Sequence, residues 1–107
     1  MNIPERIRIG YKEYRIEAQG RQDTDNDSHL GFVSHDHNLI RSQAHGEKSE
    51  CANTLLHEIL HCCCHVGEMG LDYDNEERAV SILANHLIAA MQDNPEVFRW
   101  IISNAKK

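Results

Sequence analysis

The sequence predicts an α+β fold, with strands in the N-terminal half of the chain and helices in the C-terminal half. Between residues 3 and 17, apolar and charged side chains alternate, which is the period of a half-buried strand. From residue 49 onward, apolar residues recur three and four positions apart, which is the period of an amphipathic helix. Strands followed by helices are typical of the α+β class. The chain has 107 residues, so we expect a single domain over residues 1–107.

Two strand regions are expected before the first helix. Apolar residues alternate with polar ones in the first region: Ile7, Ile9, Tyr11, Tyr14 and Ile16. Gly10 within this run indicates one or two strands with a tight turn. In the second region, residues 30–33 and 38–41 are short runs around a polar turn. We interpret the acidic residues 23–27 as a solvated loop, because the glycine and distal glutamate of an EF-hand are not at their required offsets.

Three helices are expected in the C-terminal half. The first starts at Ser49, a favourable N-cap residue, and ends near Gly67. Its apolar positions are Ala52, Leu55, Leu56, Ile59, Leu60 and Cys63. The second extends from about residue 74 to 92, and Asn94-Pro95 starts the third, because proline suits a first helical turn. We expect the apolar residues of the third helix to close the core rather than form a dimer contact: Phe98, Trp100, Ile101 and Ile102.

The charge and the cysteines narrow the possible classes of function. A formal net charge of −6 argues against a protein that binds nucleic-acid phosphates. The N-terminal residues lack the apolar run of a signal peptide, and no segment approaches the ~20 apolar residues of a transmembrane helix. Residues 62–64 are three consecutive cysteines, which suits neither a disulfide framework nor a CxxC zinc pair. We therefore expect a reduced, cytoplasmic protein without a nucleic-acid or membrane partner, with Cys63 in the core.

The strongest chemical signal is His57-Glu58-Ile59-Leu60-His61, an HExxH motif inside the first expected helix. Residues four apart lie one turn above each other on a helix, so both imidazoles can reach one zinc ion. Glu58, one step round the helix, can reach a water molecule on that zinc without binding the metal. On a helical wheel, these three side chains lie outside the apolar arc and face a cleft. The motif predicts His57 and His61 as metal ligands and Glu58 as the catalytic base.

A catalytic zinc ion keeps three protein ligands and one open position, so a third ligand is required. His65 continues the four-residue spacing, but it would lie ~12 Å from His57 along the helix, too far to share one ion. The better candidates are Glu76 and Glu77 at the start of the second helix. We favour Glu77 because it borders the apolar stripe of that helix. Two alternatives stay open: Glu76 is the ligand, or Glu77 forms a capping box with Asp74.

An HExxH helix followed by a glutamate at the start of the next helix resembles the gluzincin branch of the zincin metallopeptidases. The small size and the strand-rich N-terminal half look most like the small phage-borne relatives of the ImmA/IrrE peptidases. In that family the ligand glutamate starts an ExxAxxFA motif, and residues 77–84, Glu-Arg-Ala-Val-Ser-Ile-Leu-Ala, are similar. Val80 and Leu83 stand at its alanine and phenylalanine positions. The resemblance covers about residues 30–102, and HExxH is its one sharply specific motif.

The resemblance implies a zinc-dependent metallopeptidase that acts on a protein or peptide substrate. It implies a minimal zincin-like fold, with about three antiparallel strands above the active-site helix and the strand around Leu39–Gln43 as the edge that receives the substrate. Zinc would lower the pKa of its bound water toward ~7, and Glu58 would carry the proton to the leaving amine. Tyr73 and His45 are open candidates for stabilising the oxyanion. The alternative is a non-catalytic zincin-like zinc-binding module that acts by binding a partner.

Overall fold

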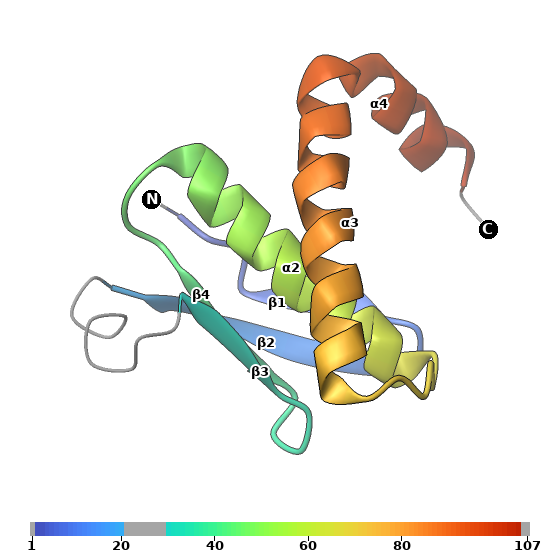
Figure 1. The fold of residues 1–107 in the computed structure, drawn as a ribbon. Helices are drawn as coiled ribbons and strands as arrows, with labels where there is room; N and C mark the ends of the chain where they lie inside the picture. The colour runs from blue at the N-terminus through green and yellow to red at the C-terminus, as the bar shows by residue number, and fades with distance from the viewer. Residues whose placement is uncertain (1, 21–29, 106–107) are drawn as a thin grey trace.

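The structure, a computed structural model, confirms the α+β class and describes residues 2–20 and 30–105. The acidic segment 23–27 lies outside the described residues. Strands occupy the first part of the chain and helices the second (Figure 1). The elements are β1 (Arg6–Ile9), β2 (Lys12–Gln19), β3 (Gly31–Ser34), β4 (Leu39–Gln43), α2 (Lys48–Val66), α3 (Tyr73–Asp93) and α4 (Pro95–Asn104).

The described strands form one mixed sheet in the order β1-β2-β4-β3. β1 and β2 form an antiparallel hairpin, and β3 and β4 form another. The two hairpins join through β2 and β4, which run parallel. The sheet has four strands, close to the expected number of about three. The expectation that all strands are antiparallel is wrong for the central pair, β2 and β4. β3 is an edge and β4 is internal, so the expected edge at Leu39–Gln43 is also wrong.

Gly10 makes the β1–β2 turn possible and lets the hairpin approach α2. Its φ of +59° lies in the left-handed region, which side chains other than glycine rarely adopt. A Cβ atom at this position would also lie 2.9 Å from Cγ1 of Val66 at the end of α2. The glycine therefore positions the sheet against the C-terminal end of that helix.

The main core lies between the sheet and α2. Its buried residues are Tyr14, Ile16, Ile40 and Cys62, with Leu55, Ile59 and Val66 packed against them. Cys62, not Cys63, continues the stripe because it lies seven residues after Leu55 and three after Ile59. Cys63 is exposed, so the expectation that it belongs to the core is wrong.

The N-cap residues of α2 and α3 are not those considered from the sequence. Glu47 is the N-cap residue of α2, so Ser49 lies within the helix. At α3 the cap is Asp72, whose Oδ1 accepts a hydrogen bond from the backbone N–H of Asn75 at 2.8 Å. The alternative of a capping box between Asp74 and Glu77 does not hold, because both residues lie inside the helix. Glu77 is thereby available for another role.

α4 does not close the core. It packs against α3, at the end away from the sheet (Figure 1), and has no buried residue. Trp100 is 67% exposed and Ile102 is 70% exposed. The expected core role for this helix is therefore wrong. Among the described helices, none combines the length and the hydrophobicity required to cross a bilayer.

Candidate metal centre

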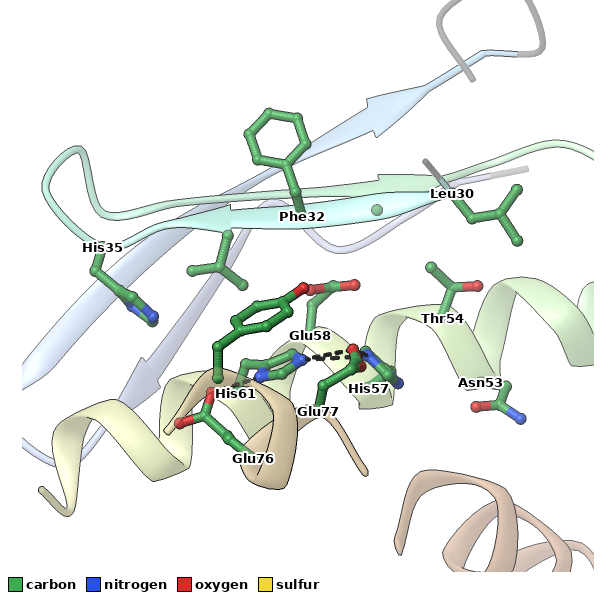
Figure 2. Close-up of a pocket in the computed structure, with 13 residues that line it drawn as sticks. Leu30, Phe32, His35, Asn53, Thr54, His57, Glu58, His61, Glu76 and Glu77 are labelled. Atoms are coloured by element: carbon green, nitrogen blue, oxygen red, sulfur yellow. Dashed lines mark hydrogen bonds and ion pairs between the residues drawn. The ribbon is translucent and has the colours of Figure 1, made fainter. Parts of the chain in front are cut away.

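Helix α2 and the first turns of α3 bring His57, His61 and Glu77 together. Nε2 of His57 lies 2.7 Å from Oε1 of Glu77, and Nε2 of His61 lies 3.2 Å from the same oxygen. The two Nε2 atoms are 3.2 Å apart. Figure 2 shows the three side chains converging below β3. The three residues form a cluster that could hold a metal ion.

The spacing of these three atoms suits a tetrahedral ion. Ligands at ~2.0–2.1 Å from a tetrahedral zinc ion lie about 3.3 Å from one another. Two of the three observed separations are 3.2 Å, and the third is 2.7 Å. The separations are therefore close to those that a tetrahedral ion requires, and the distance between His57 and Glu77 is the one that would have to increase.

Glu76 contacts the other side of the same histidine. Its Oε2 lies 2.7 Å from Nδ1 of His61 (Figure 2). A carboxylate at that position accepts the Nδ1 proton and leaves Nε2 as the lone-pair donor, the usual arrangement behind a metal-binding histidine. The two adjacent glutamates thus contact the two different nitrogens of one ring, and Glu77 is the one that belongs to the cluster that could hold a metal ion.

In the metal-free protein, the hydrogen bonds of this cluster shift the pKa values of His61 and Glu77 in opposite directions. Burial alone would lower the pKa of His61, but hydrogen bonds to Glu76 and Glu77 raise it above its ordinary value. Burial would raise the pKa of Glu77, but hydrogen bonds from His57 and His61 lower it. His61 therefore keeps its proton to a higher pH than an ordinary histidine, and Glu77 stays ionised to a lower pH than an ordinary glutamate.

Glu58 lies beside the cluster and points from α2 toward β3 (Figure 2). It is buried, with 7% of its surface exposed. Gly31 leaves space for it: a Cβ atom there would lie 3.1 Å from Oε2 of Glu58, 3.0 Å from Thr54 and 2.9 Å from the carbonyl oxygen of Arg41. The carboxylate is thereby held between the cluster and the edge strand.

The cluster and Glu58 lie in one open cavity of about 710 Å³. One wall is β3 with the turn that follows it, and the other is made by α2 and the start of α3. The lining residues are Leu30, Gly31, Phe32, Val33, His35, Asn53, Thr54, His57, Glu58, His61, Tyr73, Glu76 and Glu77. Gly31, Phe32 and Val33 of β3, an edge strand of the described sheet, therefore border the cavity.

The other candidate residues from the sequence lie at different distances from the cavity. Tyr73 lines the cavity and His45 does not. His65 stacks on His35, with ring centroids 3.9 Å apart, and belongs to no metal cluster among the described residues. His35 is a cavity residue that we did not expect from the sequence. It lies in the turn between β3 and β4, and the parallel pairing of β4 with β2 joins this hairpin to the sheet that packs on α2.

Comparison with protein-family models, curated protein sequences and solved structures finds no match to this chain. The geometry of the site and the residue chemistry therefore carry the functional argument.

Proposed function

We propose that the protein is a zinc-dependent metallopeptidase of the minimal zincin type, with His57, His61 and Glu77 as the zinc ligands. The observation that carries the proposal is the convergence of these three ligand atoms beside a buried glutamate in an open cavity. Two imidazole nitrogens and one carboxylate oxygen are a donor set typical of catalytic zinc, which keeps a fourth position open. When bound, zinc supplies a Lewis acid and a water molecule of lowered pKa.

In this proposal Glu58 is the general base. Its carboxylate takes the proton from the attacking water and gives it to the amine that leaves when the peptide bond breaks. A purely structural zinc site has no need of a base, and closes its fourth position with another protein ligand. The buried position of Glu58 between the ligands and β3 therefore favours a hydrolytic site.

A protein or peptide segment is the proposed substrate. The outer edge of β3 carries backbone groups that do not pair within the described sheet, so an extended peptide can add there as a further strand. Strand addition at Gly31–Ser34 would pass the peptide backbone over Glu58 and the ligand cluster. All four cysteines are free, which suits the reduced, cytoplasmic setting that we propose.

A non-catalytic zinc-binding interaction module is the second candidate. The exposed apolar residues of α4 favour it, because exposed apolar side chains can form a binding face. In that case zinc would join α2 to α3, and Glu58 would have no role in the solution behaviour of the protein.

Zinc analysis combined with peptide cleavage tests the proposal. Wild-type protein and Glu58→Gln are loaded with zinc and incubated with a diverse peptide library, and the products are identified by mass spectrometry. Glu50→Gln, an exposed change in the first turn of α2, is the matched control. We expect one zinc per chain in all three proteins, and cleavage by wild type and the control alone. Zinc binding with no difference between wild type and Glu58→Gln would leave the interaction module as the function.

A further inference from the structure

His35 is a second polar group that the fold holds against the cavity, on the wall opposite the metal ligands. It lies in the turn after β3, and Figure 2 shows its ring pointing from that turn into the cavity. Its backbone carbonyl accepts a hydrogen bond from Nζ of Lys12 at 2.8 Å. The turn that carries the ring is therefore tied to β2.

Two contacts hold the ring in one orientation. Nδ1 of His35 lies 3.1 Å from Oη of Tyr14, a fully buried residue of β2. One face of the ring stacks on His65 of α2, with an angle of 6° between the ring planes. Nδ1 is therefore occupied, and Nε2 is the nitrogen available to the cavity.

The ring is a neutral donor near pH 7. Burial lowers the pKa of His35, and the neighbouring His65 and Lys12 lower it further. Burial raises the pKa of Tyr14, so its phenol keeps its proton and can donate it to Nδ1. In that arrangement the single proton of the imidazole is on Nε2, facing the cavity.

The other donors that line the cavity are engaged or unfixed. Oγ1 of Thr54 donates to Gln43, and Nδ2 of Asn53 donates to Asn85, each at 2.7 Å. Tyr73 is 73% exposed, and no hydrogen bond to another described residue fixes its hydroxyl. A donor that stabilises a developing charge is effective when it is already oriented before the reaction. His35 meets this condition.

We propose that Nε2–H of His35 donates a hydrogen bond to the substrate carbonyl oxygen as that oxygen becomes negative. When water adds to the carbonyl carbon, the C=O π electrons move onto the oxygen, and the donor stabilises this charge. No proton transfer from His35 is required. The inference rests on the proposed peptidase function and assigns the oxyanion donor to a residue in the turn that follows β3.

The test compares binding of two probes to the zinc-loaded full chain by calorimetry. One is a capped leucyl-leucine peptide with a phosphonamidate in place of the peptide bond, which presents a tetrahedral anion. The other is acetohydroxamate, which binds zinc without a tetrahedral centre. The variants are His35→Ala, His35→Gln, Tyr73→Phe and His37→Ala, an exposed histidine of the same turn that does not line the cavity.

We expect His35→Ala to weaken phosphonamidate binding about 100-fold and to leave hydroxamate binding and zinc content unchanged. His35→Gln should retain most of the affinity, because its amide can replace Nε2–H, and the other two variants should match wild type. Equal phosphonamidate binding by His35→Ala, or a loss in Tyr73→Phe instead, would overturn the inference alone. A loss of both probes in both His35 variants would also overturn it, by showing a structural role. Failure of zinc-loaded wild type to bind either probe would overturn the proposed function with it.

Discussion

At the scale of single residues, Glu76 and Glu77 are sequence neighbours that contact opposite nitrogens of His61. Both glutamates lie in the first turns of α3, so helical geometry alone does not decide which of them faces the two histidines. The structure separates them, because Oε1 of Glu77 lies within 3.2 Å of both Nε2 atoms, whereas Glu76 reaches Nδ1. Their substitution should therefore have different consequences.

Glu76→Gln should weaken zinc binding by about 10- to 100-fold, because it removes the charge that orients His61 and increases its basicity. Glu77→Gln should weaken binding further, because it removes the carboxylate that we propose as a ligand. Competition with a chelator of known zinc affinity measures both, and Arg78→Gln, the next residue of the same helix, is the control. A larger loss in Glu76→Gln than in Glu77→Gln would mean that the two roles are reversed.

The stability of the metal-free protein should depend on pH, because folding shifts the pKa values of His61 and Glu77. The pKa of His61 is raised above 6.5 in the folded state, so its contribution is complete below that value and is lost as pH rises through the raised pKa. The pKa of Glu77 is lowered below 4.5, so its contribution is complete above that value and is lost as pH falls through the lowered pKa. Thermal unfolding of apo-protein should show that this contribution is greatest between pH 4.5 and 6.5. His61→Ala should remove the part that comes from His61 and keep part of that from Glu77, because His57 still contacts the Glu77 carboxylate. An unchanged pH dependence in His61→Ala would contradict this expectation.

At the scale of secondary-structure elements, the start of α3 positions the carboxylates. Asp72 caps the helix through the backbone N–H of Asn75, and the next turn carries Glu76 and Glu77. Asp72→Ala should lower the free energy of unfolding by about 1 kcal/mol and weaken zinc binding, because the first turn frays. Asp74→Ala removes an acidic residue of the same turn without removing the cap. Equal effects of the two changes on unfolding would show that charge, and not capping, stabilises this helix start.

The contact between β3 and α2 depends on Gly31. Gly31→Ala places a methyl group 2.9 Å from the carbonyl oxygen of Arg41 and 3.1 Å from Oε2 of Glu58, so β3 or Glu58 must move. We expect a loss of about 1–3 kcal/mol in unfolding free energy and lower peptide cleavage. Urea unfolding and cleavage of the same library measure both, with Ser34→Ala at the other end of β3 as control. Wild-type cleavage by Gly31→Ala would show that Glu58 does not need its observed position.

Local periodicity explains which elements could be predicted from the sequence. The HExxH histidines share a helix face by geometry alone, so their proximity required no knowledge of tertiary structure. The order of the strands was not predictable in this way, because the parallel pairing of β2 with β4 is a long-range contact. The same pairing brings His35 to the cavity, and no local signal marks it. Cys63 was misplaced because a shift of one position changes which face of a helix a residue occupies.

At the scale of the whole molecule, the sheet and α2 enclose the cluster of buried residues that contains Tyr14, Ile40 and Cys62. Ile40 is fully buried in that cluster, whereas Trp100 is exposed on a helix that contacts α3. The exposure of α4 could not be predicted from the sequence, because its apolar side chains suggest that the helix is buried. The core and α4 are therefore expected to respond differently to substitution.

Ile40→Ala should cost about 2–5 kcal/mol in unfolding free energy, because it leaves a cavity in the core. Trp100→Ser should change the unfolding free energy of the monomer by no more than about 0.5 kcal/mol, because it removes an exposed side chain. Urea unfolding at low protein concentration measures both. A large loss in Trp100→Ser would show that α4 contributes to the core in solution.

The proposed function depends on one zinc ion bound by His57, His61 and Glu77. X-ray absorption at the zinc edge of the loaded wild-type protein measures these ligands. We predict nitrogen and oxygen ligands at ~2.0–2.1 Å, with the multiple scattering of two imidazoles, and loss of this signal in His57→Ala. Sulfur scattering at ~2.3 Å would place the metal on the cysteines and contradict this proposal.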